Sequence, residues 1–214
     1  MAGRLKRSVV ALLGGAFDPI HSDHLRMAQE CVRWGLADEV WLVVAPDVRW
    51  DKRTAVPAHH RLEMVRLALA REGQILCCDA EVKAGEYRGT LRLLDRLEKD
   101  YPEREFCWMV GSNSYPMIPF WRDPTEGWKP NGEELLRRFS VMVWPRPGSE
   151  MPDEEAHRRA GWKRLVIPPQ EAWYNSSPTA SSEVRRRLAE GESVDEMVPS
   201  VVLRYITKHG LYKK

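Results

Sequence analysis

Two histidines near the amino terminus are the residues of this sequence best suited to bind a polyphosphate. His21 and His24 follow Gly14 and Gly15, and the two glycines come directly after an apolar run. Glycines let a backbone approach a phosphate closely, and a helix that starts after them directs its positive end at the anion. A spacing of three residues puts both imidazoles on one face of that helix. The segment 14–24 therefore predicts a phosphate-binding loop.

Other chemistry for this loop has less support from the residues. The glycines are not followed by the Lys-Ser or Lys-Thr pair of a Walker loop, and they do not form a GxGxxG pattern. A metal site at His21 and His24 is an alternative, but no third ligand stands at a suitable spacing, and catalytic zinc sites need three protein ligands. We therefore predict no metal ion held by side chains of this chain.

A second candidate anion site lies close to the carboxyl terminus. Ser181 or Ser182 is expected to cap a helix, which would leave backbone N–H groups free for an anion. Arg185 would stand on the first turn of that helix, with a guanidinium fork that suits phosphate. The residues alone favour phosphate binding and simple helix capping equally.

These candidates must be positioned by elements whose apolar patterns alternate along the chain. Continuous apolar runs predict buried strands, and apolar residues at helical spacing predict helices between them. Such alternation favours an α/β fold with a Rossmann-like, doubly wound parallel sheet and one domain over 1–214, with a small helical portion at about 180–214. Strands are expected at 8–13, 39–44, 74–78, 106–110, 140–144 and 165–167, and helices at 22–34, 61–71, 90–99, 133–139, 181–188 and 200–209.

Composition limits the function classes. The 214 residues are 43% hydrophobic and 30% charged, with a net charge of +2, which is an ordinary globular mixture and too weakly basic to indicate a nucleic-acid binder. The sequence has no apolar run near the ~20 residues of a membrane helix and no signal-peptide pattern, so we expect no membrane partner and a cytoplasmic location. Its four cysteines lack CxxC spacing and are expected to be reduced thiols.

The two candidate sites together resemble a known family. Residues 14–24, GGAFDPIHSDH, are similar to the GGxFDPxHxGH signature of nicotinate and nicotinamide mononucleotide adenylyltransferases, which belong to the HxGH nucleotidyltransferase superfamily. Asp23 stands where the signature has glycine, and its carboxylate would repel a polyphosphate unless it points away or meets Mg²⁺. Residues 180–185, ASSEVR, resemble the SSTxIR motif that grips the β- and γ-phosphates of ATP, and the ending HGLY at 209–212 also resembles the family.

Further segments resemble family motifs that contact the nucleosides. Residues 111–113 resemble a GAD turn near the adenosine, 118–121 an LPxW segment whose tryptophan stacks on the pyridine ring, 146–148 an RPG turn, and 87–91, loosely, an SYTxxTL stretch. The resemblance implies that His21 and His24 act at the reacting phosphates. It further implies ATP contacts by Gly14, Gly15, Ala16, Phe17, Gly111, Asn113, Ser181, Ser182 and Arg185, and contacts to the second substrate by Lys52, Tyr87, Thr90, Trp121 and Arg146.

The implied reaction is attack of a mononucleotide 5′-phosphate on the α-phosphorus of ATP, with Mg²⁺ bridging phosphate oxygens. The implied partners are therefore ATP and a pyridine mononucleotide. The sequence leaves open whether the pyridine is nicotinate or nicotinamide, and whether the chain forms a homo-oligomer. Alternatives are another transferase of the superfamily, namely a pantetheine-phosphate adenylyltransferase or a cytidylyltransferase, and a non-catalytic nucleotide-binding regulator.

Overall fold

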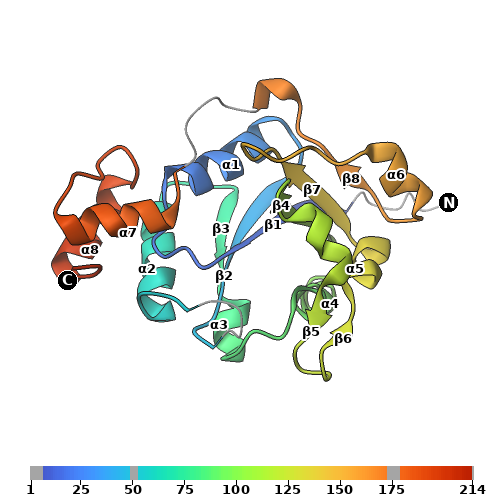
Figure 1. The fold of residues 1–214 in the computed structure, drawn as a ribbon, viewed down its shortest axis with the longest axis horizontal. Helices are drawn as coiled ribbons and strands as arrows, with labels where there is room; N and C mark the ends of the chain where they lie inside the picture. Colours follow the sequence, from blue (N-terminus) through green and yellow to red (C-terminus); the bar gives the residue numbers. More distant parts are fainter. Residues whose placement is uncertain (1–6, 49–52, 173–178, 214) are drawn as a thin grey trace. The chain divides into compact units, whose positions relative to one another are not determined.

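The computed structural model describes residues 7–48, 53–172 and 179–213 (Figure 1). Within them, one six-stranded parallel sheet has the strand order β3-β2-β1-β4-β7-β8, and a short antiparallel pair is formed by β5 and β6. The sheet strands are β1 (Ser8–Gly15), β2 (Glu39–Val44), β3 (Ile75–Cys78), β4 (Arg104–Gly111), β7 (Ser140–Trp144) and β8 (Leu165–Val166).

The order of these strands defines the fold class. Counted along the chain, the six strands run 3-2-1-4-5-6 across the sheet, which is the order of the Rossmann fold. The prediction of a Rossmann-like α/β fold is therefore confirmed. The order reverses at β1 and β4, which pair in parallel from Ser8 with Arg104 to Leu13 with Met109. In such sheets, ligands bind outside the carboxyl ends of the strands at this reversal.

The chain divides into two compact units, each assembled from separate stretches of sequence. Within the described residues, unit 1 comprises 7–13, 31–40 and 88–172, and unit 2 comprises 14–30, 41–48, 53–87 and 179–213. Our expectation of one domain over 1–214 stays a prediction.

Unit 1 surrounds β4 and β7 with helices. α4 (Thr90–Asp100) packs against β4 and against α5 (Gly132–Arg138). The apolar residues that predicted α4 are buried, Leu94 completely and Leu97 almost so. α5 also packs on the 3₁₀ helix η1 (Tyr115–Phe120). The remaining elements are β5 (Arg122–Asp123), β6 (Lys129–Pro130), α6 (Glu154–Arg159) and η2 (Gln170–Ala172).

Unit 2 contains the helices that follow β1 and β2 and the two closing helices. α2 (Ala58–Ala68) packs on β3 and on α8 (Ser200–His209) (Figure 1). The other helices are α1 (Ser22–Arg33), whose last turn belongs to unit 1, α3 (Ala80–Ala84) and α7 (Ser181–Glu190). The helical portion expected at about 180–214 is thus formed by α7 and α8.

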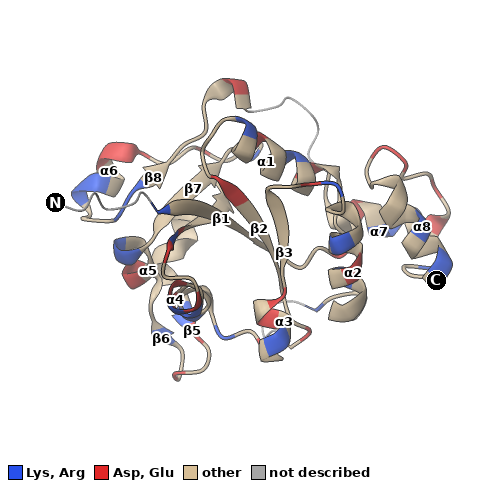
Figure 2. Cartoon of the chain, turned by 180° about the vertical axis from the view of Figure 1, so that it is seen from behind, with Lys and Arg blue, Asp and Glu red and all other residues tan. Residues whose placement is uncertain are grey.

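Among the predicted elements, α2 (Figure 2) differs most from the sequence prediction, by three residues at each end. α2 starts at Ala58 rather than at residue 61, because Pro57 takes the N-cap position and its carbonyl accepts the N–H groups of His60 and Arg61. The polar pair His59–His60 hid this first turn from the apolar pattern. The helix also ends at Ala68 rather than at the predicted residue 71.

Candidate functional site

The loop that follows β1 in unit 2 is shaped by contacts among its own residues. Phe17 adopts a left-handed backbone with φ of 49°, and its buried ring lies over Gly15. A Cβ atom on Gly15 would come within 3.0 Å of that ring, so a larger residue there would press on Phe17. The same ring makes an edge contact with His24, with 4.9 Å between the ring centroids. Gly15 therefore leaves room for the Phe17 ring, which in turn contacts His24.

His21 and His24 lie together, as their spacing predicted. Their rings are stacked, with centroids 3.7 Å apart and planes inclined by 23°. The backbone N–H of His21 donates to Nδ1 of His24 at 3.4 Å. In the neutral His24 ring the proton is then on Nε2, which becomes a donor suited to a phosphate oxygen. His21 is buried at 4% exposure, while His24 is half-buried.

Asp18, in the middle of the loop, is buried and connects three parts of unit 2. Its Oδ2 accepts the backbone N–H of Ala55 at 2.6 Å, and its Oδ1 accepts the hydroxyl of Tyr212 at 2.8 Å. Both partners are distant from Asp18 in sequence, by 37 and 194 residues. Burial and the neighbouring Asp18 carboxylate raise the pKa of Tyr212 well above its usual range, so Tyr212 is a lasting donor to that carboxylate. Sequence reasoning assigned Tyr212 no role, although it ends the family-like HGLY segment.

The start of α7 meets this loop, so the structure brings the two predicted phosphate motifs together within unit 2. Ser181 Oγ donates to the carbonyl of Pro19 at 3.1 Å, and Arg185 Nη1 donates to the carbonyl of Asp18 at 2.7 Å. The capping prediction was wrong in register. Ala180 is the N-cap residue, without a side-chain cap, and Ser181 is the first helical residue. The Ser181 hydroxyl is used by Pro19 rather than by the helix end.

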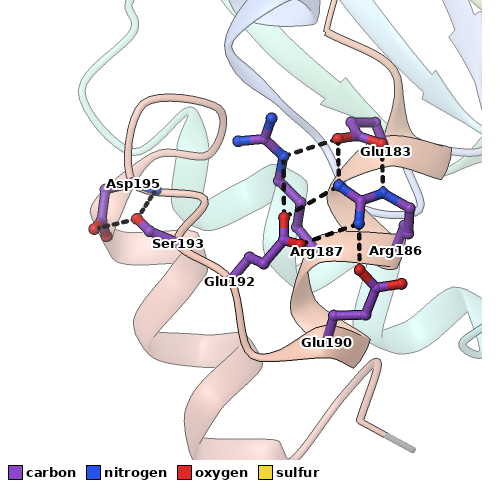
Figure 3. A network of polar contacts seen from close by, with 7 residues as sticks. All are labelled: Glu183, Arg186, Arg187, Glu190, Glu192, Ser193 and Asp195. Atoms are coloured by element: carbon purple, nitrogen blue, oxygen red, sulfur yellow. Dashed lines mark hydrogen bonds and ion pairs between the residues drawn. The ribbon is translucent and has the colours of Figure 1, made fainter.

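Only one of the three consecutive arginines on α7 is directed at the loop. Arg186 is paired with Glu183, Glu190 and Glu192, and Arg187 with Glu183 and Glu192 (Figure 3). The hydrogen bonds from Arg186 and Arg187 lower the pKa of Glu183 to about 2. This exposed network neutralises both arginines. Arg185 remains as the phosphate-binding candidate of this helix.

Asp23 is buried at the start of α1, and one of its carboxylate oxygens is bonded to backbone. Its side chain is 4% exposed, and Oδ2 accepts the backbone N–H of Thr179 just before α7. The carboxylate also lies in the first turn of α1, where the helix dipole favours negative charge. One oxygen of the carboxylate that we expected to meet or avoid a polyphosphate is therefore bonded to a backbone donor of this chain.

Arg61 of α2 is completely buried beside the loop and supports its backbone. Its guanidinium donates to the carbonyls of Ala16 at 2.7 Å, Ala45 at 2.8 Å and Val56 at 3.1 Å. It also pairs with Asp47 at 2.9 Å. Sequence reasoning assigned Arg61 no function. The signal available for it was the family-like HRL start of a helix, which does not show where the side chain points.

Three candidate residues of unit 1 lie together at the carboxyl ends of β4 and β7. Gly111 ends β4, and a Cβ atom there would lie 2.5 Å from Asn113 Oδ1 and 2.8 Å from Arg146 Cγ. The side chains of Asn113 and Arg146 therefore converge over Gly111. Ser112 joins the two strand ends, because its Oγ accepts the N–H of Arg146 and its own N–H donates to Trp144. The predicted group Gly111, Asn113 and Arg146 is thus brought together.

The remaining predicted residues have separate positions. Trp121 is half-buried after η1, and its carbonyl accepts the N–H groups of Asn131 and Gly132. Thr90 is buried at the start of α4, and Tyr87 is half-buried in unit 2 with its N–H bonded to Val48. Lys52 lies outside the described residues.

Residues 7–48, 53–172 and 179–213 can be considered for metal ligands and for membrane-spanning helices. Among those residues, no three His, Cys, Asp or Glu side chains lie together in a way that could hold a metal ion. No described helix has the length and apolar character needed to cross a membrane.

Comparison with known families defines the class of protein. The family model described as cytidylyltransferase-like matches residues 12–187, which is most of the chain. This span contains both phosphate motifs and the unit 1 group. The chain therefore belongs to the cytidylyltransferase-like family.

Individual relatives define the branch of that family. A protein of Bordetella avium is 30% identical over 95% of this chain and 98% of its own length, and one of Dehalococcoides mccartyi is 31% identical over 95% and 96%. Both are named "probable nicotinate-nucleotide adenylyltransferase". The chain belongs to the nicotinate-nucleotide adenylyltransferase family, whose members are nucleotidyltransferases.

Solved structures support the fold. The nicotinic acid mononucleotide adenylyltransferase of Plasmodium falciparum, solved in complex with NaAD, superposes with a TM-score of 0.73 over 96% of this chain and 97% of that chain. The sequence identity is 20%, so this likeness concerns the fold.

Proposed function

We propose that this chain joins the AMP moiety of ATP to nicotinate mononucleotide, with release of pyrophosphate, as a step in NAD biosynthesis. The observation that carries the proposal is the similarity, over 95% of the chain, to relatives named for this activity. We propose the nicotinate rather than the nicotinamide form of the substrate because those relatives are named for nicotinate nucleotide.

The residues of unit 2 supply the phosphate chemistry in this proposal. A mononucleotide phosphate is already a competent nucleophile, so catalysis depends on alignment and on stabilising charge at the α-phosphorus. His21 and His24 act on the polyphosphate near the reacting centre, with the glycine loop from Gly14 to Phe17 beside them. Ser181, Ser182 and Arg185 hold the leaving pyrophosphate. The contacts of Arg185 and Ser181 with the first loop support this assignment.

The residues of unit 1 supply nucleoside recognition. Gly111 and Asn113 contact the adenosine moiety of ATP, and Trp121 stacks on the pyridine ring. Arg146, Thr90, Tyr87 of unit 2 and Lys52 contact the second substrate. The convergence of Asn113 and Arg146 over Gly111 supports this part of the proposal.

Mg²⁺ belongs to the substrate in this proposal. The ion arrives bound to the ATP phosphates and neutralises their charge as pyrophosphate leaves. We place it on phosphate oxygens rather than on a resident protein site. The reaction takes place in the cytoplasm, with neither nucleic acid nor membrane as partner.

A pyrophosphate-release assay tests the proposal. The chain is incubated with Mg²⁺, ATP and, in turn, nicotinate mononucleotide, nicotinamide mononucleotide or pantetheine 4′-phosphate, and with CTP in place of ATP. We expect release only with ATP and a pyridine mononucleotide, fastest with the nicotinate form. Pyrophosphate release that occurs only with pantetheine 4′-phosphate, or only with CTP in place of ATP, would assign another transferase activity. ATP binding without release under any condition would indicate a regulator.

A matched pair of histidine variants tests the site. His24→Ala should lower kcat about 10²–10³-fold, the scale of losing a donor that stabilises transition-state charge. His59→Ala removes an exposed imidazole of α2 and should leave kcat unchanged. Equal activities of the two variants would contradict the assignment of His24.

A further inference from the structure

We propose that Asp23 is a positioning residue that anchors the segment entering α7 to the first turn of α1. The inference rests on the proposed function, because it concerns how the site holds the leaving pyrophosphate. The family signature has glycine at this position, so the anchor is a feature of this chain's own sequence.

The first observation is the state of the Asp23 side chain. A buried carboxylate needs donors to compensate for lost hydration, and Asp23 is only 4% exposed. Its Oδ2 accepts the backbone N–H of Thr179, which is 156 residues away in sequence. A charge-assisted bond of this kind is stronger than a bond between neutral groups. Glycine at residue 23 could not make it.

The second observation is what the bond holds in place. Thr179 lies immediately before Ala180, the N-cap of α7, and this N-cap has no side-chain hydrogen bond of its own. Ser181 and Arg185 at the helix start donate to backbone carbonyls upstream of the histidines, and Arg185 Nη1 also lies 3.9 Å from Asp18 Oδ2. Asp23 instead connects the entry of α7 to α1, the helix that carries His24. The direction of the first N–H groups of α7 toward a phosphate therefore depends on Asp23.

Two possible roles of Asp23 predict opposite changes in the KM for ATP when the residue is replaced. If its charge acted on the polyphosphate by repulsion, removing the charge would lower the KM for ATP. If it acts as an anchor, removing the acceptor raises the KM, because a loosened entry of α7 must be ordered by the substrate. Asp23→Asn removes the charge and keeps an oxygen acceptor, whereas Asp23→Gly and Asp23→Ala remove both.

The first measurement is hydrogen exchange of the Thr179 amide by NMR, on the full chain without substrate. We expect exchange to accelerate about tenfold in Asp23→Gly and Asp23→Ala and to change less than about twofold in Asp23→Asn. A cooperative thermal unfolding transition, measured for each variant, shows that the variant folds. Unchanged exchange in both Asp23→Gly and Asp23→Ala would overturn the proposal.

The second measurement is steady-state kinetics with ATP as the varied substrate. Asp23→Gly and Asp23→Ala should raise the KM for ATP roughly five- to tenfold, the scale of one lost buried hydrogen bond, with kcat within about twofold. Asp23→Asn should resemble the unmodified chain. A lower KM in both Asp23→Gly and Asp23→Asn would overturn the anchor in favour of repulsion. If the exchange pattern holds but even the unmodified chain releases no pyrophosphate, the proposed function fails while the anchor stands.

Discussion

Replacing the buried Arg61 by methionine tests whether the loop after β1 depends on support from α2. Methionine keeps much of the apolar stem volume and removes all the donors of the guanidinium. The carbonyls of Ala16, Ala45 and Val56 would each lose the donor that Arg61 provides. Asp47 would lose its ion pair, but it is about half exposed and can be hydrated.

The expected cost follows from the three carbonyls. A buried polar group left unsatisfied costs about 1–3 kcal/mol, and the loop can relax to recover part of that sum. Breaking a buried charge interaction by removing one partner costs about 3–5 kcal/mol in general. We therefore expect Arg61→Met to lower the free energy of unfolding by about 3–5 kcal/mol. Ala16 belongs to the predicted ATP-binding loop, so activity should fall as well.

Urea unfolding followed by tryptophan fluorescence measures this change, with pyrophosphate release measured in parallel. Arg66→Met is the control on the same helix, because Arg66 is about half exposed and has a surface ion pair with Asp79. The control should lose no more than about 1 kcal/mol. A loss below about 1 kcal/mol for Arg61→Met would refute the reasoning that these carbonyls depend on the guanidinium.

Three further predictions follow from particular contacts. Tyr212→Phe should destabilise the chain at neutral pH by about 1.5–3 kcal/mol, the value of a bond to the charged Asp18. Because the pKa of Tyr212 is raised in the folded chain, its contribution to the free energy of unfolding is complete below about pH 10 and is lost as the pH rises further. If the unmodified chain and Tyr212→Phe differed by the same free energy of unfolding at alkaline pH as at neutral pH, this reasoning would be contradicted. Desolvation and the nearby histidines lower the pKa of His60, so stability should fall as the pH drops through about 6.5, and His60→Gln should remove part of that fall in acid titrations. Gly111→Ala should displace Asn113 and Arg146 from above the end of β4 and lower kcat/KM roughly tenfold or more, with little change in Tm. An unchanged kcat/KM would argue against a role for this strand end.

Much of the fold follows from patterns that are local in sequence. A buried strand needs a continuous apolar run and an amphipathic helix needs apolar residues at helical spacing, so β2, β7 and α8 were predicted with the bounds that the structure has. The location of the candidate site was predicted for a related reason. Parallel strands bring their carboxyl ends to one edge of the sheet, so glycine-rich turns after β1 and β4 mark candidate ligand positions.

The start of α7 shows where local reasoning fails. Serine is a frequent N-cap, but the first helical residue here is Ser181, and its hydroxyl donates to Pro19, which is 162 residues away. A preference of about 1 kcal/mol for a serine cap is small enough for such a tertiary bond to shift the helix start by one residue.

The sequence by itself determined the fold class, the family resemblance and the pairing of His21 with His24, because these depend on neighbours along the chain. The tertiary structure alone decided that Asp23 binds the segment before α7 and that the Asp18 carboxylate is held by Tyr212. Each of these contacts joins residues more than 150 positions apart, so the direction of each side chain depends on the path of the whole intervening chain. The sequence left open whether the acidic residue in the signature repels phosphate, points away or meets Mg²⁺, and the bond from Thr179 carries our proposal that it is a backbone anchor.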